Sequence, residues 1–301
     1  MSAASEAPAL APPQRIAAAP RSRRVKELAF RVVMLACLGA GLLVLAVLFV
    51  DVLRDGLGQI DVQFLTSFAS SQSEIAGIEA AILGTLWLMA LCAIFIVPVG
   101  VATAIYLEEY ADSDRWWNRM IDVNIQNLAA VPSVVYGILG LAFLVRGPLQ
   151  LGFVVVAGAI TLGLLVLPVV IITARESIRS VPPSIREGAL ALGATQWQTI
   201  RKQVLPAAVP GIATGVILAL SRAIGETAPL VLVGGASYIA FNPNSLDDRY
   251  TALPLQIFTW IKLPQEDFQA LAAGAILVLL VVLLSMNAVA IVLRNRFENK
   301  W

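Results

Sequence analysis

The sequence contains no histidine and only two cysteines, and charged residues make up 14% of its 301 residues. The absence of histidine removes the side chain that most often shuttles protons or binds metals near neutral pH. Cys37 and Cys92 both lie in apolar runs, so we expect neither a disulfide framework nor a metal site. The sequence also lacks a G-x-x-x-x-G-K-[ST] phosphate loop, so it does not hydrolyse ATP by that route. We therefore expect no catalytic residue and no cofactor in this chain.

Apolar residues dominate the chain, since 58% of it is hydrophobic and its mean hydropathy is +0.82. A soluble domain carries about 25% charged residues, so the low charge indicates an integral membrane protein. A helix needs about 20 mostly apolar residues to cross roughly 30 Å of hydrocarbon. Six windows meet this requirement and predict an all-α fold with six transmembrane helices. The windows are residues 30–52, 78–107, 125–146, 151–174, 207–235 and 268–293.

Lysine and arginine are unequally divided between the segments that join these windows. With the N-terminus in the cytoplasm, sixteen basic residues fall on the inner side and four on the outer side. Because short positively charged segments stay in the cytoplasm, both termini are expected there. The inner residues are Arg15, Arg21, Arg23, Arg24, Lys26, Arg31, Arg115, Arg119, Arg175, Arg179, Arg186, Arg201, Lys202, Arg294, Arg296 and Lys300, and the outer ones are Arg54, Arg146, Arg249 and Lys262.

The sequence predicts four segments along the chain. Residues 1–28, rich in proline, alanine and arginine, are expected to form a disordered cytoplasmic tail. Residues 29–77 comprise the first transmembrane helix and an outer loop. Residues 78–293 form the membrane core, which includes a cytoplasmic loop at 176–206. Residues 294–301 form a second cytoplasmic tail.

The loop at residues 176–206 contains the signals of two short helices. Pro182 and Pro183 are expected to end the preceding helix, because a proline ring clashes with the helical ladder. Ser184, followed three residues later by Glu187, has the spacing of a capping box that begins a new helix.

The end of the first short helix and the start of the second are also marked. Gly193 is expected to adopt the left-handed conformation that ends a helix. Thr195 and Gln198 repeat the capping-box spacing and start the second helix. We expect that helix to end at Leu205 and Pro206. A membrane protein with such a glycine-jointed pair of helices in a loop presents a surface to a soluble partner.

These residues resemble the EAA loop of permeases in ABC-type importers. Two positions depart from the usual pattern, because Gly188 replaces an alanine and Gln203 replaces an aliphatic residue. The resemblance implies the type I ABC importer permease class, in which the loop forms a coupling helix that fits into a groove on a cytosolic ATPase. The residues that carry the match are Glu187, Gly188, Ala189, Gly193, Leu205 and Pro206.

The fifth window contains two charged residues, Arg222 and Glu226. At about 1.5 Å per residue, Arg222 lies roughly 24 Å along the helix from Pro206, near or somewhat beyond the middle of a bilayer. A lone charge there costs at least ~2.5–3.5 kcal/mol, although residues four apart on a helix can pair. Because two leucines would insert more readily, the pair is a candidate for function.

The chemistry of this pair suits a tetrahedral oxyanion. The planar fork of donors on Arg222 matches two oxygens of such an anion. Glu226 can accept a hydrogen bond only from an oxyanion that carries a proton, as phosphate does near neutral pH and sulfate does not. Ser221 and Thr227 add hydroxyl groups to the predicted pathway. A pair that fixes helix packing, or gates the path without touching substrate, remains an equally open interpretation.

The surrounding motifs are similar to phosphate-transport permeases of the PstA type. Ala223–Gly235 reads AIGETAPLVLVGG and Ala130–Phe143 reads AVPSVVYGILGLAF. The resemblance implies an inorganic phosphate importer in the bacterial inner membrane. Its implied partners are a sister permease of the PstC type, two cytosolic ATPase subunits of the PstB type that bind ATP, and an extracytoplasmic phosphate-binding protein of the PstS type. Membrane lipid is expected around the chain, and no nucleic acid.

Two other functions are consistent with the residues. One is a self-sufficient secondary carrier driven by protons through Glu226, although we see no other carboxylates near the membrane centre to relay protons. The other is an ABC permease for sulfate, molybdate or an organic solute, which only the fifth-window motif argues against.

Two loops and a set of glycines complete the expectations. Residues 108–124 contain seven charged side chains and are expected to form a solvated inner surface. The apolar stretch Leu253–Ile261 is expected to lie along the membrane surface or against another subunit. This outer loop could receive an extracytoplasmic binding protein, and plain loop packing is an equally open interpretation. Close approach of helices is expected at Gly137, Gly140, Gly158 and Gly163.

Overall fold

The computed structural model describes residues 21–112, 114–234 and 238–297, which form helices and connecting loops with no β-strand in those ranges. The chain divides into two units, residues 1–51 and 52–301. Most of the predicted N-terminal tail, residues 1–20, lies outside the described residues. So do residues 298–301 of the predicted C-terminal tail.

Helix α1 (Arg21–Gly56) supplies the described part of the first unit. It begins at Arg21, so the helix takes in the last residues of the predicted tail. Apart from Arg31, its residues from Leu28 to Val50 are apolar on every side of the helix, and large ones such as Leu42 and Leu43 are 58% and 64% exposed. A helix with no polar face belongs in an apolar environment such as a membrane. The first predicted span is therefore confirmed as a helix.

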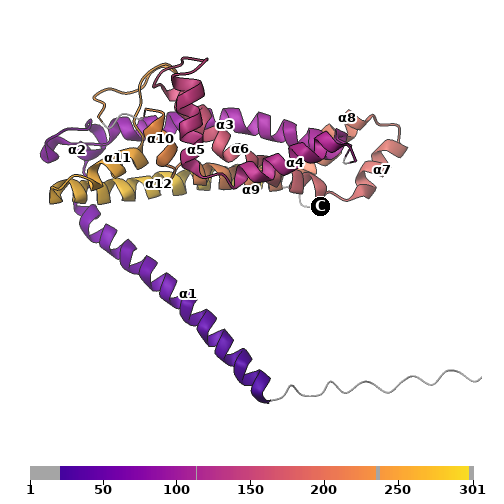
Figure 1. The fold of residues 1–301 in the computed structure, drawn as a ribbon, viewed down its shortest axis with the longest axis horizontal. Coiled ribbons are helices and arrows are strands. Elements are labelled where there is room, and N and C mark those ends of the chain that lie inside the picture. Colours follow the sequence, from indigo (N-terminus) through magenta and orange to yellow (C-terminus); the bar gives the residue numbers. More distant parts are fainter. Residues whose placement is uncertain (1–20, 113, 235–237, 298–301) are drawn as a thin grey trace, which may run out of the picture. The chain divides into compact units, whose positions relative to one another are not determined.

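The second unit contains the remaining helices (Figure 1). They are joined by loops, by the 3₁₀ segments η1 (Leu57–Gln59) and η2 (Ser73–Ile75), and by π-helical segments. The helices are α2 (Val62–Thr66), α3 (Glu79–Ile105), α4 (Trp116–Ala129), α5 (Ser133–Leu139), α6 (Val155–Arg179), α7 (Pro183–Ala191), α8 (Gln196–Thr199), α9 (Leu205–Ala223), α10 (Ala228–Leu232), α11 (Leu253–Ile261) and α12 (Glu266–Phe297), and the π segments are η3 (Tyr106–Tyr110), η4 (Gly140–Val145) and η5 (Ile200–Val204).

Helices α3, α6, α9 and α12 form the long core of this unit, and α7 and α8 lie together at one of its ends (Figure 1). Helices α3 and α6 run parallel, because Gly163 faces Phe95 and Gly100 faces Val170. A Cβ atom added at Gly163 would lie 2.6 Å from the Phe95 ring, and one added at Gly100 would lie 2.7 Å from Val170. Glycine thus lets the two backbones approach closely.

Helix α9 runs antiparallel to both α6 and α12. A Cβ atom on Gly211 would lie 2.9 Å from the Ser177 Cβ atom, whereas Gly215, one turn later, faces Thr173, one turn earlier in α6. Lipid tails are as apolar as leucine, so such close packing, rather than exclusion of water, holds helices together in a membrane.

The predicted close approaches are confirmed at the four glycines Gly137, Gly140, Gly158 and Gly163.

The third predicted window is not one continuous helix. Helix α4 and the α5–η4 segment meet at a bend of 108°. Pro132 lies in the break between the two helices, and a proline disfavours the helical conformation for the residue before it. The Tyr136 hydroxyl donates a hydrogen bond of 2.9 Å to the Leu128 carbonyl across the bend. Among the described residues, five helices are long and apolar enough to cross a membrane, and the bent pair would be a sixth span.

Residues Leu253–Ile261 form helix α11, and one face of it packs within the chain, as in the plain loop packing that the sequence left open. Leu253, Gln256 and Trp260 are 0%, 1% and 2% exposed, and α11 packs against α12 and α3. The Trp260 ring centre lies 6.3 Å from that of Phe268 and 6.2 Å from that of Phe64. One face of this apolar stretch therefore belongs to the core of the chain itself, whereas Phe258 and Ile261 on the stretch are 40% and 53% exposed.

Candidate functional site

The first short helix of the loop, α7, begins differently from the prediction. Its N-cap is Pro182, no side chain caps it, and Pro183 occupies the first turn. The capping box predicted at Ser184 and Glu187 is therefore wrong. The fixed φ of proline is suited to the first helical position, where an amide hydrogen would have no partner. Ser184 is thus already inside the helix.

The end of α7 follows the prediction. Gly193 has φ +83°, a left-handed conformation that glycine adopts at no steric cost. The Gly193 amide donates to the Leu190 carbonyl at 2.9 Å, and the Ala194 amide donates to the Ala189 carbonyl at 3.1 Å. These two bonds are those of a Schellman motif. Gly193 therefore fixes the turn between the two short helices.

The second helix begins with the predicted capping box. The Gln198 amide donates to the Thr195 hydroxyl at 3.3 Å, and the Thr195 amide donates to the Gln198 side-chain carbonyl at 2.9 Å. Two amide groups that a helix start leaves without partners are satisfied in this way.

The predicted end of this helix at Leu205–Pro206 is wrong. Helix α8 passes through the π segment η5 directly into α9, and the Leu205 amide bonds to the Ile200 carbonyl. A π turn shifts the bonding partner by one residue, which lets the ladder pass a proline that has no amide hydrogen. The loop is therefore joined to α9 as one helical rod, Gln196–Ala223.

The surface of the loop exposes apolar side chains. Leu190, Leu192 and Trp197 are 49%, 91% and 53% exposed. Glu187, Gly188 and Gly193 are exposed too, and Ala189 is partly buried. Large apolar groups on a short polar loop indicate a contact with another protein.

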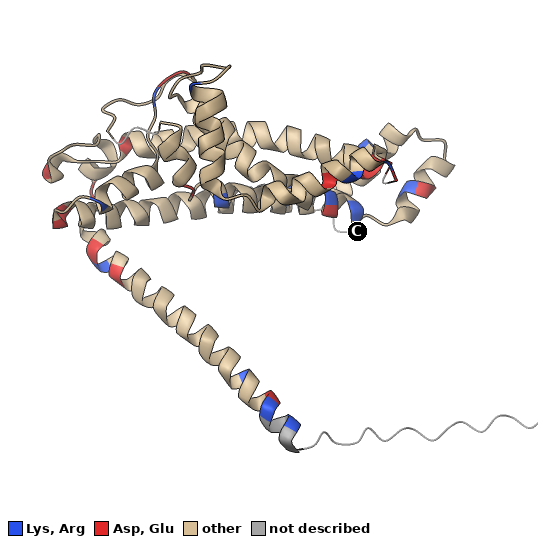
Figure 2. Cartoon of the chain, viewed as in Figure 1, with Lys and Arg blue, Asp and Glu red and all other residues tan. Residues whose placement is uncertain are grey.

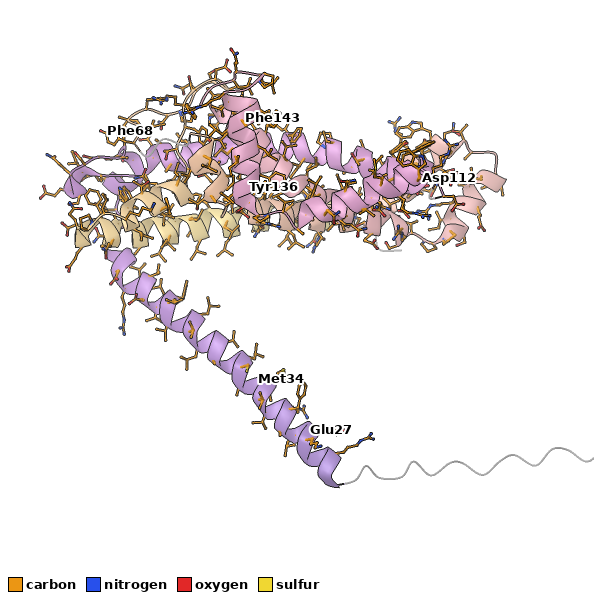
Figure 3. All side chains as sticks on the ribbon, viewed as in Figure 1. Glu27, Met34, Phe68, Asp112, Tyr136 and Phe143 are labelled. Carbon is orange, nitrogen blue, oxygen red and sulfur yellow. The ribbon has the colours of Figure 1, made fainter. Side chains whose placement is uncertain are left out.

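A cluster of charges lies at the same end of the unit (Figure 2). The predicted solvated surface at residues 108–124 is confirmed in part, because four of its charged residues are exposed (Asp112, Asp114, Arg115 and Arg119), whereas the other three are half-buried in ion pairs. Glu108 Oε1 lies 2.9 Å from Arg179 Nε, and Glu108 Oε2 lies 3.6 Å from Arg175 Nε. Arg175 also pairs with Asp122. Figure 3 places Asp112, of the same loop, beside these helices. The acidic residues thus join α3, α4 and α6. The sequence signal for these ion pairs was the spacing of four residues between Arg175 and Arg179, because this spacing puts both side chains on one helix face.

The charged pair of the fifth window is formed as predicted, but on a different backbone. Arg222 Nε lies 3.3 Å from Glu226 Oε1, and their side chains are 44% and 19% exposed. Helix α9 ends at Ala223, so Glu226 lies in the break before α10. Pro229 explains the break, because it has no amide hydrogen to bond to the Gly225 carbonyl four residues earlier.

The predicted hydroxyl groups have distinct surroundings. The Ser221 hydroxyl lies 2.7 Å from Asn287 Oδ1 of α12 and 2.8 Å from the Ile217 carbonyl. Thr227 stands at the start of α10 without a side-chain cap bond. Sequence reasoning missed Asn287, although a single amide in an otherwise apolar run is a recognisable signal. The structure brings Ser221, Arg222 and Glu226 together at the α9–α10 break, beside α12.

The profile of the family described as "Binding-protein-dependent transport system inner membrane component" matches residues 96–300. The chain belongs to this family. Together with the apolar helices, this membership shows a multi-pass membrane protein.

Several relatives carry the name "Phosphate transport system permease protein PstA". That of Mycobacterium leprae is 39% identical over 216 residues, covering 70% of this chain and 68% of the relative. That of Xylella fastidiosa strain Temecula1 is 34% identical over 249 residues, covering 81% and 84%. PstA 1 of Mycobacterium tuberculosis strain H37Rv is 35% identical over 220 residues, covering 72% and 70%.

Solved structures share the fold at low identity. A chain of a bacterial alginate ABC transporter has a TM-score of 0.66 and 18% identity, and the match covers 89% of this chain and 94% of that one. A chain of the methionine ABC transporter MetNI in an inward-facing conformation has a TM-score of 0.60 and 14% identity, covering 74% and 98%. The fold is therefore that of an ABC importer permease.

Proposed function

We propose that this chain is the PstA-type permease subunit of an ATP-driven importer of inorganic phosphate. Relatives that carry this name cover more than two thirds of the chain. In this proposal the chain forms half of the translocation path in a bacterial inner membrane. It is not itself an enzyme and holds no cofactor, because ATP binds to separate subunits.

The partners follow from the exposed loop. The surface of Leu190, Leu192 and Trp197, with Glu187 and Gly188 beside it, would dock on a cytosolic ATPase of the PstB type. Two such ATPase subunits, a sister permease of the PstC type and a phosphate-binding protein of the PstS type would complete the importer. This arrangement places the loop and both termini in the cytoplasm, in agreement with the distribution of basic residues.

The substrate path would pass the break between α9 and α10. Arg222 would bind two phosphate oxygens, because its side chain is 44% exposed and its described bond to Glu226 uses only the Nε atom. Glu226 would accept a hydrogen bond from the protonated oxygen of the anion. Ser221 and Thr227 would add hydroxyl contacts nearby. A lone cation at this depth would be costly, and Glu226 balances its charge whenever substrate is absent.

Coupling would use the continuous rod from Gln196 to Ala223. ATP binding would close the ATPase pair and move α7 and α8 as one body, since Gly193 fixes the turn between them. Arg222 lies 26 residues beyond Gln196, or roughly 39 Å at about 1.5 Å per residue. A tilt of the rod at the loop would therefore displace the charged pair and switch its access between the two sides of the membrane.

The observation that carries this proposal is the charged pair at one end of a rod whose other end is the exposed loop. The test is uptake of radioactive inorganic phosphate into vesicles that contain the complex co-purified from native membranes, with sulfate as the matched competitor. Uptake that requires ATP and ignores excess sulfate supports the proposal. Uptake of sulfate in place of phosphate contradicts it. A self-sufficient proton carrier is no longer a candidate, because the family depends on binding proteins.

A further inference from the structure

Several carboxylates form described ion pairs at the end of the unit where the loop lies. Among them, Glu109 has the least exposed side chain. It lies on η3, which extends α3, and its side chain is 9% exposed. Its Oε1 atom accepts two hydrogen bonds from Arg186 of α7, from Nε at 3.0 Å and from Nη2 at 2.8 Å. Two charge-assisted bonds from one guanidinium fix the relative orientation of the two groups, and burial shields them from salt.

The same guanidinium also closes the end of α6. Arg186 Nη1 donates to the Val181 carbonyl at 2.6 Å, and Nη2 donates to the Ile178 carbonyl at 2.8 Å. The last carbonyl groups of a helix have no partners within it and carry partial negative charge. Arg186, which lies on α7, therefore contacts η3 at the end of α3 through Glu109. It also contacts the end of α6 through the Ile178 carbonyl, and the turn after α6 through the Val181 carbonyl.

The second short helix, α8, also contacts Glu109, at the backbone carbonyl of that residue. Gln196, the first residue of α8, donates its side-chain amide to the Glu109 carbonyl at 2.5 Å. Glu109 thus receives α7 at its carboxylate and α8 at its carbonyl oxygen. Both arms of the loop meet α3 at one residue.

Apolar packing does not fix α7 in the same way. The helix has no buried residue, and Ile185 is only partly buried where it packs against a core cluster that includes Ile178 and Val204. The polar contacts of Arg186 are therefore the main attachment of α7 to the membrane core within the described residues. A helix held in this way keeps its angle only while those contacts remain.

We propose that Glu109 and Arg186 are positioning residues for coupling, which make the loop move as one body with α3 and α6. The proposal rests on the proposed function, because it names how force on the loop reaches the membrane helices. Without the pair, the ATPase would still bind the exposed face of α7. The helix would then rotate locally, without displacing α3 and α6.

The test measures phosphate taken up per ATP hydrolysed in vesicles that contain the native complex. Glu109→Gln and Arg186→Gln are each expected to lower this ratio at least tenfold, while the ATPase subunits stay bound and hydrolyse ATP. The double variant is expected to be no worse than Arg186→Gln, because the change at Arg186 already removes the contact with Glu109 as well as those with the two carbonyls. Arg186→Lys should recover the ratio only in part, since an ammonium group cannot reach the carboxylate and both carbonyls together.

The matched control is Glu176→Gln, which removes an ion pair with Arg179 at 3.3 Å from a side chain that is 65% exposed. The control should keep the wild-type ratio. If Glu109→Gln keeps the wild-type ratio of phosphate uptake to ATP hydrolysis, and the wild-type complex is itself coupled, this inference is overturned but the proposed function is not. Loss of the ATPase subunits from Glu109→Gln also overturns it, because the pair would then serve assembly. If wild-type vesicles take up no phosphate, the proposed function itself fails.

Discussion

Arg222 Nε lies 3.3 Å from Glu226 Oε1 although the helix that carries Arg222 ends at Ala223, between the two residues. The pair therefore spans a break in the backbone and is not fixed by a helical ladder. Apolar helices surround the pair. Figure 3 shows Tyr136 of α5, a member of the apolar core, partway along the second unit. A charged pair on a joint can open when the joint moves, which a pair on a rigid helix cannot do.

We expect Arg222→Gln to lower phosphate uptake at least tenfold while the complex assembles with its ATPase. The variant keeps a polar side chain of similar length and loses the charge that would attract the anion. Uptake of radioactive phosphate, measured with the amount of co-purified ATPase, checks this. A variant that fails to assemble would show that the pair is structural.

Gly193→Val should uncouple ATP hydrolysis from phosphate uptake. The left-handed conformation costs an ordinary residue roughly 1–2 kcal/mol, and a β-branched one more, so the turn between α7 and α8 would change angle. The ratio of uptake to hydrolysis is expected to fall several-fold. Gly58→Ala is the control, because Gly58 lies outside the loop and an added Cβ atom there meets nothing within 4 Å. Undiminished phosphate uptake in the valine variant would contradict the proposal that α7 and α8 move as one body.

Thr195→Ala should destabilise the start of α8 by about 1 kcal/mol, the usual effect of losing an N-cap side chain. Hydrogen exchange of the amides at residues 197–199 is expected to become about fivefold faster. Ser184→Ala should leave exchange in α7 unchanged, because no side chain caps that helix. Equal effects at the two positions would contradict the different helix starts in the structure.

Gly158→Ala should destabilise the complex by about 1–3 kcal/mol through overpacking. The added Cβ atom would lie 2.6 Å from the ring of Tyr250, which is fully buried. Thermal unfolding of the purified complex in detergent measures the effect. Gly58→Ala, where nothing lies within 4 Å, is the control and should not lower the unfolding temperature.

The sequence was sufficient for the features that depend on local chemistry. Gly193, and the Thr195–Gln198 box, behave as predicted because each is determined by its own backbone and immediate neighbours. The helices at five of the six windows follow from apolar length alone. The pairing of Arg222 with Glu226 was predictable from charge, whereas their roles in transport stay predictions.

The features that failed depend on residues far apart in the chain. The boundary of the second short helix was wrong because a π turn, invisible in local spacing, carries the ladder past Pro206. The burial of one face of Leu253–Ile261 was not predictable, because only the fold brings Trp260 of α11 against Phe64 of α2. The contact of Glu109 with Arg186 spans 77 positions, so charge patterning along one loop could not reveal it.

The most direct measurement is phosphate accumulation in vesicles that contain this chain alone, beside vesicles that contain the full complex. The account predicts accumulation only in the full complex, only with the binding protein outside, and only with ATP on the ATPase side. Accumulation by the isolated chain without any nucleotide would contradict it.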